Sequence, residues 1–439
     1  MRNLLICIGG SDDKMQIRRI KIDGFKNIDN VQIELNKNIL SLLSINSYGK
    51  SNFLNGLLFG FNFIHLSRES KDIMMSNLSN IPLNRKKLYS DFSFEIELID
   101  KDYNNIIYGY SFSWKKNKSN NSKILEEYLK IKDNDSQKYS FYIKRNNDET
   151  FIKTSVTGGC SKKIKIENNE LVINKLIAYD DLYYLELIKR INNINIYVDR
   201  HFNTNNLYDV ETILRKNYTD CQLDDITNVP RILFKIKKDY PNKYEKIINT
   251  VKDIFPFIND IKVISYDINN EVMNKTIKED DYFTIAKKIY FSVVIDKNII
   301  EPIEISDMSD GVKRVLLIFT TLVLADINNY SLVAIEEPEN SLNPKILQRY
   351  LIALNSFSRN TNVIITSHSP YLINYLNPSN IYLGLPNTEG VARFNRIKEK
   401  SSNKLLLDAK NMDMLVGDYL FDLMSGDGSD LEIINKYME

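Results

Sequence analysis

The feature that most constrains the fold of this chain is a hydrophobic run that leads through a short polar loop into an apolar stretch. The run is Ile39–Leu43, the loop is Ser44–Gly49, and Lys50-Ser51 precede the apolar stretch Phe53–Phe63. A short apolar run bounded by polar turn residues is typical of a buried strand, and the longer apolar stretch is typical of a helix. The sequence therefore predicts a strand, a tight loop and a helix in that order.

The loop SINSYGKS, residues 44–51, fits the phosphate-binding pattern G-x-x-x-x-G-K-[ST], with Ser44 in the place of the first glycine. Backbone N–H groups of such a loop surround phosphate oxygens at a helix N-terminus. Lys50 would reach the β- and γ-phosphates, and the Ser51 hydroxyl would ligate Mg²⁺. Ser44 and Ser47 depart from the pattern, because serine adopts positive φ less readily than glycine. A strand-to-helix turn that contains Gly-Lys-Ser by chance is the alternative.

A second candidate lies at residues 331–339 (SLVAIEEPE), where an apolar strand ends in two adjacent carboxylates. Glu336 could serve Mg²⁺, and Glu337 could polarise an attacking water molecule. A buried strand that simply runs into an acidic turn is the alternative.

Two further patterns are weaker when taken alone. Ser309-Asp310-Gly311 precedes a long apolar helix, so it offers N–H groups to an anion, as any helix cap would. His368 follows the strand-like run from Asn362, at the sheet edge where α/β proteins bind ligands. A structural or solvated histidine is the alternative there.

The periodicity predicts the remaining elements. Residues 91–114 alternate with period two around an Asn-Asn turn, which indicates a hairpin. Helix and strand alternate after residue 311, which predicts an α/β sheet with parallel strands. Helical periodicity appears at Asp181–Ile191, Asp209–Lys216, Lys243–Phe255 and Ser402–Met424.

The predicted organisation has five segments. They are an N-terminal extension (1–14), a lobe with the phosphate loop and an antiparallel sheet (15–175), a helical insertion (176–260), a second lobe (261–400) and a C-terminal helical tail (401–439).

Composition excludes several classes of protein. Lys and Arg total 58 against 57 Asp and Glu, which argues against a basic nucleic-acid coat. Three cysteines and three histidines, widely spaced, exclude a disulfide framework and a Cys/His zinc ribbon, so we expect a reducing cytoplasm. No run reaches the roughly 18 apolar residues of a membrane span, so no membrane partner is expected.

Order and spacing unite these patterns. Residues 22–27 (IDGFKN) resemble the opening motif of one family of proteins, and residues 44–52 (SINSYGKSN) resemble its motif GxNGxGKSN. Residues 309–311 resemble the signature LSDG, residues 336–344 (EEPENSLNP) resemble EEPExxLHP, and residues 366–371 (TSHSPY) resemble TTHSPY. The chain thus resembles the prokaryotic AAA-family ATPases with ABC-type heads, which include overcoming-lysogenization-defect and phage-defence ATPases. RecF and SMC heads are more distant kin.

The resemblance implies an α/β fold of the ABC-type P-loop NTPase head, with a mixed sheet lobe, an antiparallel β lobe and a helical insertion. It implies ATP and Mg²⁺, with Ser51 and Glu336 at the metal. Glu337 would be the catalytic base and His368 the γ-phosphate sensor, beside Lys50. The residues implied to contact the nucleotide are Lys26, Asn27, Asn46, Ser47, Gly49, Lys50, Ser51, Asn52, Ser309 and Gly311.

The signature residues Ser309 and Gly311 would act on ATP held by a second subunit, and the loop Asn340–Asn343 would lie between the two sites. This implies a homodimer, or a larger assembly of dimers, tightened by ATP.

Three roles compete. The first is a sensor or regulatory ATPase of an antiviral system, with a separate effector such as a nuclease or toxin that docks on residues 176–255. The second is DNA repair or maintenance of the RecF/SMC kind, with DNA bound at Lys162–Lys165 or Lys235–Lys246, although lysines on a solvated helix face are the alternative. The third is an ATP-dependent nuclease of the overcoming-lysogenization-defect kind. It is disfavoured because about 70 residues follow His368, fewer than the roughly 100–150 of a typical domain.

Overall fold

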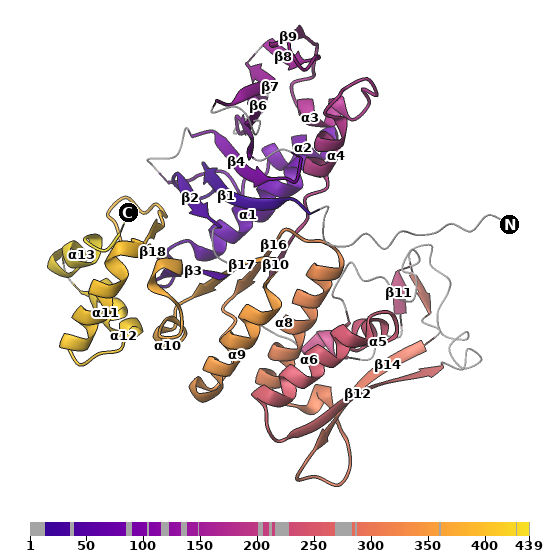
Figure 1. Ribbon diagram of the computed structural model, residues 1–439, viewed down its shortest axis with the longest axis vertical. Helices are drawn as coiled ribbons and strands as arrows, with labels where there is room; N and C mark the ends of the chain where they lie inside the picture. Colours follow the sequence, from indigo (N-terminus) through magenta and orange to yellow (C-terminus); the bar gives the residue numbers. More distant parts are fainter. Residues whose placement is uncertain are drawn as a thin grey trace. The chain divides into compact units, whose positions relative to one another are not determined.

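The computed structural model of the chain describes residues 14–35, 39–84, 90–102, 105–115, 123–132, 138–147, 149–200, 205–209, 213–215, 228–267, 283–285, 288–359, 361–426 and 428–438. The predicted N-terminal extension, apart from Lys14, lies outside these residues. The chain divides into two compact units (Figure 1). The first comprises residues 1–198, 329–336 and 361–439, and the second comprises residues 199–328 and 337–360.

An antiparallel eight-stranded sheet forms one layer of the first unit, in the order β2-β1-β4-β5-β6-β7-β8-β9. Its strands alternate between buried and more exposed residues, so one face holds the apolar side chains. The predicted hairpin is confirmed as β4 and β5, with Phe92 paired to Phe112. The strands are β1 (Gln16–Asp23), β2 (Val31–Glu34), β4 (Phe92–Ile99), β5 (Asn105–Phe112), β6 (Ile124–Lys132), β7 (Ser140–Asn146), β8 (Glu149–Lys153) and β9 (Cys160–Lys163).

A six-stranded sheet forms the second layer of this unit, in the order β10-β16-β17-β3-β18-β19. The pairs β16–β17, β17–β3 and β3–β18 are parallel, which confirms the predicted α/β sheet. β3 and β16 are buried along their whole length, as the strands of a parallel sheet covered on both faces are. The strands are β3 (Ile39–Ser44), β10 (Ile196–Asp199), β16 (Leu332–Glu336), β17 (Asn362–Ser367), β18 (Ile381–Gly384) and β19 (Asn395–Arg396).

Helix α1 (Lys50–His65) contacts both sheets of the first unit, through β1 and β3 (Figure 1). Its phenylalanines and leucines are buried around most of the helix, which is why the stretch after the phosphate loop is apolar without a clear period. A Cβ at Gly60 would lie 2.3 Å from the Phe94 ring on β4, so only glycine lets α1 approach the sheet this closely.

Shorter helices complete the first unit. They are α2 (Arg68–Met75), α3 (Val172–Leu176), α4 (Leu185–Asn192), α10 (Pro370–Ile373), α11 (Ser402–Asn411), α12 (Val416–Ser425) and α13 (Gly428–Asn435). The single helix predicted over Ser402–Met424 is wrong, because α11 ends before Met412 and α12 begins at Val416. Asp413 between them has φ 54°, and a left-handed residue of this type ends a helix.

The second unit packs helices against a small antiparallel sheet. Helices α5 (Val229–Asp239) and α6 (Pro241–Ile254) lie on β12 (Ile258–Asp267) and β14 (Lys288–Asp296), with β15 (Ile303–Glu304) beside β14. The long helix α8 (Asp310–Ile327) contacts α6 and α9 (Pro344–Phe357).

The helix predicted over Asp209–Lys216 is wrong where the structure describes it. Residues Ile213–Arg215 form β11, which pairs with β13 (Phe283–Ile285), and residues 210–212 and 216 lie outside the described residues. A short apolar run does not distinguish helix from strand by its period, so the distant partner strand decides.

The structure is thus a mixed α/β architecture, as predicted. Across the described segments, no helix combines the length and the apolar character needed to cross a lipid bilayer. The predicted domain boundaries remain predictions.

Candidate nucleotide-binding site

The loop between β3 and α1 is fixed around the ammonium group of Lys50. This side chain is buried, and its Nζ donates to the backbone oxygen of Ser44 at 2.9 Å, to the Ser44 hydroxyl at 3.2 Å and to the backbone oxygen of Ile45 at 3.3 Å. Ser44 is the last residue of β3 and has no positive φ. Serine in place of the first glycine of the pattern therefore causes no backbone strain and adds an acceptor for Lys50.

Ser47 and Gly49 carry the sharp turn of the loop. Ser47 has φ 60°, a left-handed conformation that costs a non-glycine residue roughly 1–3 kcal/mol. Gly49 has φ 135°, and a Cβ there would lie 2.7 Å from the Cβ of Ala392 and 3.0 Å from the Oδ1 of Asn27. Glycine is required at residue 49, whereas serine at residue 47 is tolerated under strain.

The hydroxyl of Ser51 donates a hydrogen bond to the carboxylate of Glu336. Ser51 lies in the first turn of α1 and Glu336 at the end of β16, so the fold joins two residues that are 285 positions apart. Glu336 is buried, with 6% of its surface exposed. A hydroxyl and a carboxylate are oxygen ligands of the kind that Mg²⁺ prefers.

Asn27 bridges the loop and the helix. Its Nδ2 donates to the backbone oxygen of Tyr48 at 2.9 Å, and its Oδ1 accepts from the Nδ2 of Asn52 at 2.8 Å. The preceding residue, Lys26, has φ 51° and donates its backbone N–H to Asn80 at 3.0 Å. The structure therefore places residues 26 and 27 beside the loop, while their contact with a nucleotide stays a prediction.

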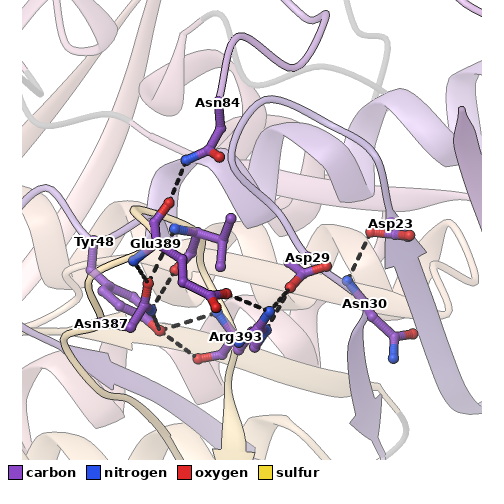
Figure 2. A network of polar contacts seen from close by, with 9 residues as sticks. Asp23, Asp29, Asn30, Tyr48, Asn84, Asn387, Glu389 and Arg393 are labelled. Carbon is purple, nitrogen blue, oxygen red and sulfur yellow. Dashed lines mark hydrogen bonds and ion pairs between the residues drawn. The ribbon is translucent and has the colours of Figure 1, made fainter. Parts of the chain in front are cut away.

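A segment that the sequence did not point to, residues 387–393, packs against the loop through Tyr48 (Figure 2). The Tyr48 hydroxyl donates to the backbone oxygen of Arg393 at 2.9 Å and accepts from the backbone N–H of Arg393 at 3.1 Å. Burial raises the pKa of the Tyr48 phenol, and the hydrogen bond from Arg393 opposes that shift in part, so the hydroxyl is a donor at neutral pH. In the sequence, only the presence of a tyrosine at a position that the phosphate-binding pattern leaves open could have indicated this contact.

His368 directly follows β17 and is exposed. Thr366 on β17 pairs with Glu336 on β16 and with Leu42 on β3, so these three strands end at one edge of the sheet. His368 therefore lies at the same edge as Glu336 and the phosphate loop.

The remaining predicted residues belong to the second unit. Glu337 follows Glu336 in the chain, has φ 47°, and accepts a hydrogen bond from the Nδ2 of Asn340 at 2.9 Å. Ser309 precedes the first residue of α8, and a Cβ at Gly311 would lie 2.7 Å from the backbone oxygen of Ser341. The signature and the loop Asn340–Asn343 are thus in direct contact within this unit.

The structure thus gathers the phosphate loop, Asn27, Asn52, Glu336 and His368 in the first unit, and Ser309, Gly311 and Glu337 in the second. Asn46 and Ser47 are exposed in the loop. The role of each residue remains a prediction.

These residues fit a nucleotide with Mg²⁺. The first N–H groups of α1 have no acceptor within the helix, as at every helix start. The loop before them turns at Gly49, where a larger residue would clash with Ala392 and Asn27. Lys50 supplies a positive charge beside these N–H groups, and Ser51 with Glu336 supplies two oxygen ligands. Lys50, Ser51 and Glu336 are therefore suited to phosphate and metal.

One family model matches part of the chain. Residues 194–374 match the family model described as "AAA domain, putative AbiEii toxin, Type IV TA system". The matched segment includes Ser309, Glu336, Glu337 and His368. The predicted resemblance to AAA-family ATPases is confirmed over this segment. A search of curated proteins finds no match to this chain.

Several solved structures are similar in fold. The SMC head bound to the C-winged helix domain of ScpA is 12% identical, with a TM-score of 0.48 and coverage of 89% of this chain and 99% of that chain. An SMC head with an extended coiled coil from Pyrococcus furiosus, bound to the C-terminal domain of ScpA, is 11% identical, with a TM-score of 0.48 and coverage of 90% and 100%. The recombination mediator RecF is 11% identical, with a TM-score of 0.40 and coverage of 88% and 100%. These likenesses concern the fold alone.

Replacing each loop serine by glycine tests the two backbone conformations. Ser47→Gly relieves the left-handed strain, so the free energy of unfolding should stay unchanged or rise by up to about 1 kcal/mol. Ser44→Gly removes a buried strand side chain that accepts from Lys50, so the free energy of unfolding should fall by about 1–2 kcal/mol. Urea unfolding of the nucleotide-free chain measures both. An equal loss in the two variants would contradict the assigned conformations.

Proposed function

We propose that this ABC-type ATPase head binds ATP with Mg²⁺ and hydrolyses it to ADP and phosphate. The observation that supports the proposal best is the hydrogen bond between Ser51 and Glu336 beside the buried ammonium of Lys50. Residues with the chemistry of a phosphate clamp and of a metal site converge there from distant parts of the chain. A chance Gly-Lys-Ser turn would not bring a buried carboxylate to its serine.

Lys50 would bind the β- and γ-phosphate oxygens with the ammonium group that contacts the carbonyl oxygens of Ser44 and Ile45 in the structure. The N–H groups at the start of α1 would donate to the same phosphates. His368 would donate to the γ-phosphate from the end of β17. Together these donors would orient the terminal phosphate and stabilise the charge that it carries during transfer.

Ser51 and Glu336 would hold Mg²⁺, which neutralises phosphate charge when it is bound. Glu337 would accept a proton from the attacking water. The hydrogen bond from Asn340 to one oxygen of the Glu337 carboxylate fixes the orientation of that group. We therefore expect slow turnover in the isolated chain, because a base of this kind needs a closed site around the water.

Two substitutions separate binding from chemistry. Lys50→Ala should weaken ATP binding by roughly 10- to 100-fold, because it removes charge-assisted hydrogen bonds to phosphate. Glu337→Gln should bind ATP as the wild type does and lower turnover by roughly 100-fold or more, because a general base is lost. Calorimetric ATP binding and phosphate release measure the two effects.

Asp422→Asn, which changes an exposed carboxylate on α12, is the control and should leave both quantities unchanged. If neither the wild type nor Glu337→Gln binds ATP, the proposed nucleotide site is wrong.

We further propose that two copies of the chain close around ATP. Ser309 directly precedes the long helix α8, Gly311 lies in its first turn, and Ser309 is exposed. Among the described residues its side chain makes no capping hydrogen bond, so the hydroxyl does not stabilise the start of α8. ATP bound to a second copy, related by a two-fold axis, would place its γ-phosphate beside Ser309 and Gly311.

Ser309→Arg tests the dimer. The exposed position should accommodate the side chain without unfolding, whereas a bulky cation at the signature should block closure over ATP. Light scattering should show that ATP doubles the molar mass of Glu337→Gln, and that Ser309→Arg combined with Glu337→Gln binds ATP as a monomer. A dimer that forms equally well with Ser309→Arg would contradict this arrangement.

For the cellular role we propose a cytoplasmic sensor or regulatory ATPase of a prokaryotic antiviral system, acting with a separate effector such as a nuclease or toxin. Support comes from the matched family description, which names a toxin of a toxin–antitoxin system. It also comes from exposed apolar side chains on and between α11 and α12, namely Leu406, Leu407, Met412 and Leu415. Such side chains are typical of a protein-binding surface.

DNA maintenance of the RecF/SMC kind is the second candidate, favoured by the face of β6 and β7 that carries Lys130 and Phe141. Lys130 Nζ lies 4.5 Å from the ring centroid of Tyr128 and 5.1 Å from that of Phe141, and Lys144 Nζ lies 5.5 Å from that of Phe141. Phe141 is 37% exposed. Interleaved lysines and aromatic rings suit single-stranded nucleic acid.

The predicted DNA surface at Lys235–Lys246 receives no support from the geometry. Tyr244 is buried and donates to the backbone oxygen of Ile261, and Lys243 forms an ion pair with Asp326 at 2.6 Å. Lys235 pairs with Asp239 at 2.8 Å. These two lysines therefore pair with carboxylates of α8 and α5, which favours the alternative of lysines on a solvated helix face.

Phe141→Ala distinguishes the two roles. If the chain is a DNA-maintenance ATPase, this variant should lose about tenfold in affinity for a fluorescent oligothymidine, because one stacked base is lost. If it is a defence ATPase, Phe141→Ala should protect cells against phage as well as the wild type, when expressed with its neighbouring genes. Lys50→Ala is the control and should abolish protection. Loss of oligonucleotide binding together with unchanged protection would rule out DNA as the working partner.

A further inference from the structure

The side chain of Tyr48 points out of the phosphate loop and into a frame made by residues 387–393 (Figure 2). Its ring packs edge-on against Phe394, with centroids 5.6 Å apart. A Cβ at Gly384 would lie 2.4 Å from the Tyr48 ring, so glycine at the end of β18 makes room for it. Its hydroxyl both donates to and accepts from the backbone of Arg393.

The frame is itself held by polar contacts on both sides. Asn387 Nδ2 donates to the backbone oxygen of Val391 at 2.8 Å and to the Tyr48 hydroxyl at 3.4 Å. The Arg393 guanidinium forms ion pairs with Asp29 and with Glu389, the second at 2.9 Å. The frame is therefore tied to the segment that follows Asn27.

A second set of contacts holds the backbone of the loop at the same residue. Asn27 Nδ2 donates to the Tyr48 carbonyl, and the Asn27 carbonyl accepts from the N–H of Ala392 at 2.7 Å. Ala392 is also the nearest neighbour of a Cβ at Gly49. Tyr48 is thus fixed at its carbonyl and at its phenol, between the two residues with positive φ.

We propose that Tyr48 is a positioning residue for the nucleotide phosphates, held by residues 387–393 so that the N–H groups of Ser47 and Gly49 keep one orientation. The inference rests on the proposed ATP site. A loop that is ordered before the ligand arrives loses less conformational entropy on binding. The frame substitutes for the loop geometry that small residues give in the usual pattern.

Tyr48→Phe tests the inference, because it removes the hydroxyl and keeps the ring. The Kd for ATP and the KM should rise about three- to tenfold, as expected for lost hydrogen bonds, with kcat within about twofold of the wild type. Tyr382→Phe is the matched control. It removes a hydroxyl on β18 that accepts from the Glu34 N–H at 2.8 Å, and it should leave Kd and KM unchanged.

A second variant addresses a general loss of structure. Asp29→Asn keeps the shape of the side chain and removes the charge that pairs with Arg393, so it should raise Kd about two- to fivefold. The melting temperature of the nucleotide-free chain should stay within a few degrees in all three variants.

The inference is overturned if the wild type binds ATP and Tyr48→Phe binds it equally well. It is also overturned if Tyr382→Phe weakens binding as much, or if the loss of affinity follows the loss of melting temperature. Absence of ATP binding by the wild type would instead contradict the proposed function itself.

Discussion

The parallel pairing of β3, β17 and β16 is the constraint on which the candidate site depends. Parallel strands end at a common edge, so the register that pairs Thr366 with both Leu42 and Glu336 also aligns the three loops that follow. The Ser51–Glu336 contact and the position of His368 are consequences of that register. A slip of one residue would turn the side chains of a strand to the opposite face and separate the serine from the carboxylate.

Four of the eight non-glycine residues with positive φ in the described part of the chain lie in segments of the candidate site. Lys26, Ser47, Glu337 and Ser341 all have positive φ without being glycine, and each lies in a segment that the sequence singled out. Such conformations cost roughly 1–3 kcal/mol each and persist where neighbouring contacts determine them. Here the neighbours are identifiable, since Lys26 donates to Asn80 and the Glu337 carboxylate accepts from Asn340.

The sequence predicted what depends on local pattern. Gly49-Lys50-Ser51 after an apolar run defined the strand, the loop and the helix, and the alternation of residues 92–112 defined the hairpin. It failed where a distant partner decides, as at Ile213–Arg215, whose strand forms on residues 283–285. It also failed where one residue ends a helix, as at Asp413. The frame around Tyr48 was beyond reach, because its contacts join residues 345 positions apart.

The unusual composition of the phosphate loop and the presence of this frame have a common explanation. A glycine-rich loop can adopt the required turn because glycine has no Cβ that would clash. It loses more conformational entropy on ordering than a loop with larger residues. In this chain the Ser44 hydroxyl accepts from Lys50, and Ser47 adopts a strained left-handed conformation. The Tyr48 side chain is long enough to reach the backbone of Arg393 beyond the loop. Side-chain contacts with Asn27 and Arg393 then determine the turn that glycine would otherwise only permit. The departures from the phosphate-binding pattern are therefore consistent with a loop whose shape is imposed by its surroundings.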